Sequence, residues 1–135
     1  METVGKAWAK RLEIAEDFRR ADKLMRERRA HEEEALTIIS TIPGIIEKAG
    51  DTNSVKAFGW IECHDVAGED PNRVDQLAER LEAENRVLHP DDLEGRAAMV
   101  FAWCDDNDLE CFLESESVLM NGDEYNFCVR PKKTA

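Results

Sequence analysis

The sequence lacks the short motifs that mark many catalytic and nucleotide-binding sites. It contains no G-x-S-x-G elbow for a serine nucleophile, and no G-x-G-x-x-G or G-x-x-x-x-G-K-S/T loop for phosphate groups. It also lacks an apolar run near the ~20 residues of a membrane span, and no apolar signal-peptide core follows Met1. We therefore expect no membrane association and a cytoplasmic location, which is the host cytoplasm if the source is a virus.

The spacing of the cysteines and histidines does not form a zinc-binding motif. The four cysteines are at positions 63, 104, 111 and 128, and the three histidines are at 31, 64 and 89. No pair has the C-x2–4-C or H-x3–5-H spacing of zinc ligands, so we predict neither a metal nor another cofactor. In the cytoplasm we expect reduced thiols, three of them within apolar runs. A catalytic Cys–His pair could be assembled only in space.

Positive charge is scarce in most of the chain. Residues 51–129 hold five Lys or Arg against twenty Asp or Glu, whereas residues 1–50 hold ten of each, and the whole chain has a net charge of −12. Such an acidic segment repels nucleic-acid phosphates and anionic membranes and favours basic partners. We therefore predict a protein partner with a basic surface, and no direct binding of nucleic acid. The alternative is that the acidity only maintains solubility.

Glycine and proline are absent between Gly5 and Pro43, which predicts one long helix or two helices in tandem. An apolar stripe with steps of three and four residues supports this prediction. Its members are Val4, Trp8, Leu12, Ala15, Phe18 and Met25. Pro43 removes a helical hydrogen bond, so we expect a break there and a short helix ending at Gly50. Residues 1–50 are thus predicted to form a helical arm, and residues 51–135 an acidic α+β body in the same cooperative unit.

Six basic residues lie close together in this helix, between Arg19 and Arg29. The interleaved Asp22 and Glu27 favour a solvated, salt-bridged helix face. The alternatives are a basic stripe for nucleic acid, or docking onto the acidic body of the same or a second chain.

The body is predicted to contain two or three helices and a small antiparallel C-terminal sheet, an α+β fold. Residues 55–63 fit both helical and strand periods, and we favour a helix. Further helices are expected at 72–85, capped by Asn72, and from Pro90 to Cys104. Strands are expected at 109–113, 118–120 and 125–129, with a turn at Asn121-Gly122. Because residues 97–104 are apolar on every face of a helix, we expect them to be buried at the centre of the fold.

The acidic turn Asp105–Asp108 follows this central helix and is the first candidate for a contact surface. Each acid at a helix C-terminus interacts unfavourably with the helix dipole and destabilises the helix by roughly 0.3 kcal/mol or more. A basic partner that binds these acids would offset this cost. The alternatives are a simple polar turn and a cation site formed with Glu110. The residues that we assign to partner binding are Asp105, Asp106, Asp108, Glu110, Glu79, Glu82 and Asp92.

Three functional hypotheses follow. The first is a non-enzymatic inhibitor or regulator that covers the nucleic-acid-binding surface of a partner, by analogy with anti-restriction and anti-CRISPR proteins. The second is a structural or assembly module, a homodimer formed through its N-terminal helices. Its contact residues would be Trp8, Leu12, Ala15 and Phe18. The third is a small metal- or thiol-dependent enzyme.

Overall fold

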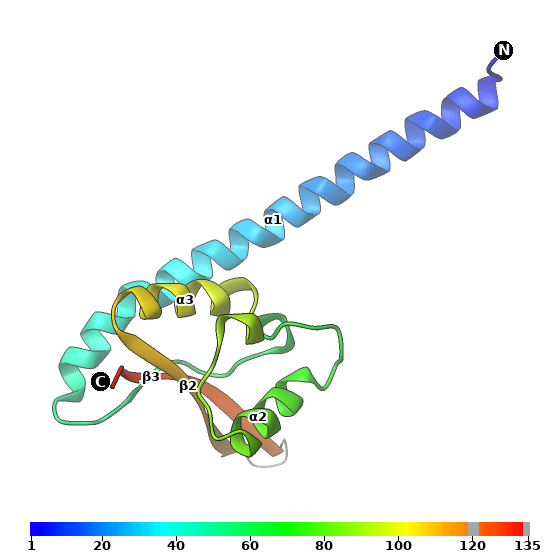
Figure 1. The fold of residues 1–135 in the computed structure, drawn as a ribbon. Helices are drawn as coiled ribbons and strands as arrows, with labels where there is room; N and C mark the ends of the chain where they lie inside the picture. Colours follow the sequence, from blue (N-terminus) through cyan, green and yellow to red (C-terminus); the bar gives the residue numbers. More distant parts are fainter. Residues whose placement is uncertain (119–121, 134–135) are drawn as a thin grey trace. The chain divides into compact units, whose positions relative to one another are not determined.

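The computed structural model describes residues 1–118 and 122–133, and it confirms the α+β fold with a long N-terminal helix. Helix α1 spans Val4–Ala49. The chain divides into two compact units, residues 1–31 and 32–135, so that the boundary lies within α1 (Figure 1). The first unit is the N-terminal part of α1. The second unit holds the rest of α1 and all of the other helices and strands.

Helix α1 does not break at Pro43, so the predicted break is wrong. The helix continues through Pro43 and Gly44 and ends at Ala49, and Gly50 follows with a φ of 61°, the left-handed conformation that often terminates a helix. Pro43 is exposed, whereas Ala35 and Ile42 are fully buried in the core of the second unit. Packing on the buried side therefore offsets the one hydrogen bond that proline removes.

The sheet has three antiparallel strands in the order β1-β3-β2. Residues Val55–Phe58 form strand β1, so the helix that we predicted for residues 55–63 is wrong. Its first residue pairs with Val129, and a bulge before Phe58 lets both Ala57 and Phe58 be buried. The sequence of this segment fits both periods, and pairing with β3 selects the strand.

Strands β2 (Leu109–Val118) and β3 (Gly122–Pro131) form the long hairpin of the sheet. We expected two short strands where the structure has the single strand β2. Pairing with β3 runs from Leu109 opposite Pro131 to Val118 opposite Gly122. The predicted strand end at 119–120 and Asn121 of the predicted turn lie outside the described residues.

Helices α2 (Arg73–Ala83) and α3 (Gly95–Asp106) confirm the two body helices, with corrections at their starts. Asn72 precedes α2, but its side chain accepts no capping hydrogen bond from the described residues. Pro90 does not begin α3, because residues 90–92 form a separate 3-10 turn, η2. The extended residues Leu93 and Glu94 separate this turn from α3, which begins at Gly95 with a φ of 59°.

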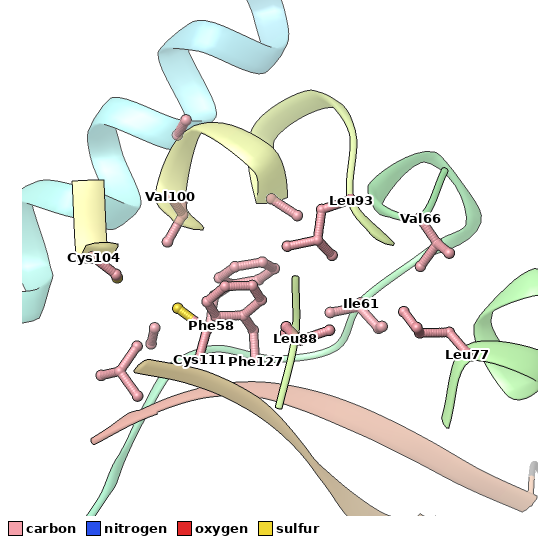
Figure 2. Close-up of a cluster of buried hydrophobic side chains, with 14 of the residues drawn as sticks. Phe58, Ile61, Val66, Leu77, Leu88, Leu93, Val100, Cys104, Cys111 and Phe127 are labelled. Carbon is pink, nitrogen blue, oxygen red and sulfur yellow. The ribbon is translucent and has the colours of Figure 1, made fainter. Parts of the chain in front are cut away.

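The core lies between α3 and the sheet, where the rings of Phe58 and Phe127 stack with centroids 4.9 Å apart (Figure 2). Helix α3 contributes three fully buried residues, Ala97, Val100 and Cys104. Its Ala102 is exposed, so the prediction that this helix is buried on every face is wrong. The helix covers one face of the sheet, which needs only one apolar stripe.

Two buried aspartates tie the loops of the second unit together. Asp65 ends the 3-10 turn η1 (Cys63–Asp65), as Asp92 ends η2. Each carboxylate accepts the backbone N–H three residues earlier and an arginine fork, from Arg96 and Arg86 respectively. The residues that follow the two aspartates form an antiparallel β-bridge, Val66 with Leu93. These charged pairs are therefore part of the scaffold.

Candidate partner-binding surface

The seven carboxylates that we assigned to partner binding lie in three places. Glu79 and Glu82 are on α2, Asp92 is in η2, and the remaining four lie between the last turn of α3 and the start of β2. The chemistry of each place decides how much of its negative charge is available to a partner.

Asp92 faces its own protein. It is 8% exposed, and Arg86 donates to both of its oxygens, at 2.8 and 3.2 Å. Burial alone would raise the pKa of Asp92, but the hydrogen bonds from Arg86 and from the His89 N–H outweigh burial and lower it. Its charge is therefore compensated within the fold.

The acidic turn is partly neutralised by the C-terminal tail. The Lys132 ammonium lies 2.5 Å from the Asp105 carboxylate, and Arg130 forms a salt bridge with Glu110. Asp106 and Asp108 are exposed, and no side chain in the described part of the chain pairs with their carboxylates. Asp106 and Asp108 are thus available to bind a partner, but the nearby Lys132 and Arg130 would repel a cationic one.

This turn also borders a hollow of about 400 Å³. Phe101 and Leu109 line it together with Lys132 and Lys133. The mixed charge of its rim makes the hollow less selective for a basic partner than a uniformly acidic surface would be.

A second, larger cleft lies between α2 and the β2–β3 hairpin, with a volume of about 500 Å³. Glu79 and Glu82 form its rim on the helix, and Asp123 at the start of β3 forms it on the hairpin. Leu113 and Tyr125 give the cleft an apolar lining. Arg86 and Arg130 also line the cleft, and each forms a salt bridge within the fold, Arg86 with Asp92 and Arg130 with Glu110. The cleft therefore combines an apolar floor, a rim of carboxylates and two arginines whose charges are already paired.

The negative charge around the cleft affects the pKa of the Tyr125 hydroxyl. Burial raises its pKa, and four carboxylates raise it further. They belong to Asp75, Asp123, Glu79 and Glu82. Within the described residues these carboxylates form no hydrogen bond or salt bridge, in contrast to Asp92, Asp105 and Glu110. Glu79, Glu82 and Asp123 line the cleft, and Asp75 lies outside its lining but close enough to act on the Tyr125 hydroxyl. We call the cleft, together with these four residues, the acidic cleft.

Helix periodicity and strand register together build the acidic cleft. Leu77 and Leu81 are buried and fix the rotation of α2. Asp75, Glu79 and Glu82 are four and three residues apart, so they share one side of the helix. Asp123 faces them because the hairpin register sets it opposite Ser117. Asp75 and Asp123 were not among the contact residues predicted from the sequence. The spacing on α2 could have revealed Asp75, whereas Asp123 depends on a register that only the structure supplies.

The cysteines and histidines were the sequence candidates for a metal or thiol site. Among residues 1–118 and 122–133, no group of three or more His, Cys, Asp or Glu side chains is arranged to hold a metal ion. The four cysteines are free, and only Cys63 is exposed. Burial first, and then the nearby Glu114, raises the pKa of the Cys128 thiol to about 11. The hydrogen bond with Cys104, and then burial, raises the pKa of Cys111, so the Cys111 and Cys128 thiols are both protonated at neutral pH.

The apolar residues that we assigned to dimerisation lie in the first unit. Trp8, Leu12 and Phe18 are large and exposed, and Ala15 is half-buried. All four belong to α1 before His31, where the helix forms a compact unit by itself. Their apolar surface is thus left to solvent or to a partner.

Comparison of the chain with protein-family models, with curated proteins and with solved structures gives no match. The helices of the described residues include none with the length and apolarity needed to cross a membrane.

Proposed function

We propose that this protein is a non-enzymatic inhibitor or regulator that binds a basic, nucleic-acid-binding surface of a partner protein through its acidic cleft. The observation that carries this proposal is the group of carboxylates at an apolar floor, three lining the cleft and Asp75 beside them, none of which pairs with another side chain among the described residues. Carboxylates at three- and four-residue spacing on a helix repel one another, at a cost of about 0.2–0.5 kcal/mol per pair. A basic partner would remove that repulsion.

The composition of the cleft also suits a protein partner. Its carboxylates would pair with Lys or Arg, and the floor formed by Leu113 and Tyr125 would accept the aliphatic part of the same side chains. Nucleic acid is disfavoured as the direct ligand because its phosphates carry the same charge as the rim. In this mode of action the protein occupies the site that nucleic acid would otherwise fill, as anti-restriction and anti-CRISPR proteins do.

The proposed contact surface leaves out three of the seven residues predicted from the sequence, Asp92, Asp105 and Glu110, because each is paired with a basic side chain of the fold. Glu79 and Glu82 stay in it, joined by Asp75 and Asp123. Asp106 and Asp108 are secondary contacts at the tip of α3. We propose the cytoplasm, or that of the host, as the compartment, and the four free thiols are in keeping with it.

Competition with nucleic acid tests the proposal. The full chain is used to capture proteins from the cell in which it acts, and each captured nucleic-acid-binding protein is then purified. We expect this protein and nucleic acid to exclude each other from that partner. A ternary complex, or capture of proteins that bind no nucleic acid, would contradict the proposal.

A further inference from the structure

The first unit of the chain presents a long helix face that nothing in the described residues covers. Trp8, Phe18 and Met25 are 58%, 72% and 63% exposed. From Val4 to His31 the helix is about 42 Å long at 1.5 Å per residue, and an isolated helix gains little stability in water without a packed apolar face.

The exposed face follows the seven-residue period of a two-helix seam. Steps of four and three residues from Val4 lead along one side of the helix, as at the a and d positions of a coiled coil. The residues at these positions are Val4, Trp8, Arg11, Ala15, Phe18, Asp22 and Met25. Five are apolar, and the two charged ones, Arg11 and Asp22, have opposite signs. The positions of those two charges decide which partner, and which direction, the seam can accept.

We propose that residues 4–29 of α1 pair in antiparallel orientation with the same residues of a second copy of this chain. The two-fold axis passes between Glu16 and Asp17. Arg11 then faces Asp22 of the second copy, and Asp22 faces its Arg11. One dimer therefore contains two Arg11–Asp22 pairs, and no charge of the seam is left without a partner.

The same register matches the apolar residues. Trp8 meets Met25 of the second copy, and Ala15 meets Phe18, so each large side chain lies opposite a smaller or more flexible one. The face is therefore self-complementary, as a two-fold symmetric interface requires.

Residues beside the seam extend the contact. Ile14 lies against Ala21 of the second copy, and Leu12 lies against the aliphatic stem of its Arg19. Leu24 falls on the opposite side of the helix and stays exposed. The register therefore covers all of the large exposed apolar residues in the first unit except Met1, which precedes the helix, and Leu24. Those covered are Val4, Trp8, Leu12, Ile14, Phe18 and Met25.

A parallel pair is disfavoured by the same two charges. It would place Arg11 against Arg11 and Asp22 against Asp22 within the seam. Like charges in contact at an interface cost several kcal/mol, whereas opposite charges fix the register. The charge pattern therefore selects the antiparallel dimer. The proposal concerns the first unit and does not depend on the acidic cleft.

A charge exchange tests the direction of pairing in the full chain. Arg11→Asp and Asp22→Arg each create two like-charged contacts in the antiparallel dimer, and each should weaken the dimer by about tenfold or more in sedimentation equilibrium. The double variant R11D/D22R recreates both opposite-charge contacts and should return close to the wild-type dissociation constant. A parallel dimer keeps like charges in contact in all four proteins, so it would show no such rescue.

Circular dichroism serves as the control on helix content, because Asp22 also pairs with Arg26 along the helix, at 2.5 Å. A second pair of variants distinguishes a residue of the dimer seam from an exposed residue outside it. Phe18→Glu should dissociate the dimer, while Leu24→Glu, an exposed residue of the same helix, should leave it intact. A wild-type chain that stays monomeric at roughly millimolar concentration overturns the proposal. So does a dimer that survives Phe18→Glu, or one that the double charge exchange does not restore.

Discussion

Asp65 is fully buried, and the guanidinium of Arg96 donates to both of its oxygens at 2.9 and 3.0 Å. The same guanidinium lies 5.0 Å from the centroid of the Phe58 ring and bonds to Glu34 of α1. In a chain rich in carboxylates, this one and Asp92 are scaffold because each is paired with arginine and with a backbone N–H. Burial and pairing, which are not visible in the sequence, separate such residues from contact charges.

Removing Arg86 from the Asp92–Arg86 pair should reverse the way in which Asp92 makes the stability of the protein depend on pH. Arg86→Met leaves Asp92 buried without its fork, and we expect a loss of about 3 kcal/mol at pH 7. In the wild type the pKa of Asp92 is lowered, so its stabilisation is present above about pH 4 and is lost as the pH falls further. In the variant uncompensated burial raises that pKa, so protonation stabilises the variant as the pH falls.

Urea denaturation at several pH values between neutral and about 4 measures this difference. The stability gap between wild type and variant should narrow steadily as the pH is lowered. The control is Glu84→Gln, since Glu84 is the exposed partner of the same arginine and should contribute less than about 1 kcal/mol. A gap that is constant with pH would show that Asp92 does not titrate differently in the two proteins.

At the scale of elements, α1 carries a proline that its packing tolerates. Pro43 lies inside the helix on its exposed side. Pro43→Ala should restore one helical hydrogen bond and stabilise the protein by about 1–3 kcal/mol, measured as the free energy of unfolding. Gly44→Ala, the neighbouring exposed site with open space for a Cβ, should add only about 1 kcal/mol. If Pro43→Ala destabilises the protein, the ring makes a contact that outweighs the lost bond.

The elements that the sequence predicts are those with an uninterrupted period. Helix α2 has its apolar residues on one stripe, and β3 carries apolar residues from Tyr125 to Val129, so both could be predicted. Strand β1 could not be told from a helix, because residues 55–63 fit both periods and its pairing with β3 is visible only in the structure. The continuation of α1 through Pro43 could not be predicted either, because it depends on the burial of Ile42 against residues far along the chain.

The candidate site was predictable to the same degree. Glu79 and Glu82 follow from acidity and helix spacing, whereas Asp123 joins them only through the hairpin register. Local acid density favoured the turn Asp105–Asp108, but its neutralisation by Lys132 requires the tail to return to the end of α3. Long-range charge compensation therefore decided which acidic cluster is the better candidate.

At the scale of the whole molecule, the net charge of −12 opposes compactness by self-repulsion. Raising the salt concentration from about 0.01 M to about 0.3 M should therefore stabilise the isolated protein by about 1 kcal/mol, or roughly 4 °C in its melting temperature. The buried pairs of Asp65 and Asp92 are screened less than the surface, so they should not cancel this gain. A melting temperature that falls with salt would mean that attractive surface pairs outweigh the repulsion.

The most direct measurement of the central claim is the affinity for the captured partner as a function of ionic strength. Three proteins are compared: wild type, E79Q/E82Q in the acidic cleft, and D51N/E69Q, which neutralises two exposed acids elsewhere in the second unit. We predict a steep loss of wild-type affinity with added salt. E79Q/E82Q should bind more weakly at low salt and with a shallower slope, and D51N/E69Q should follow the wild type. An affinity indifferent to salt, or an equal loss in both double variants, would contradict the claim that the acidic cleft binds the partner.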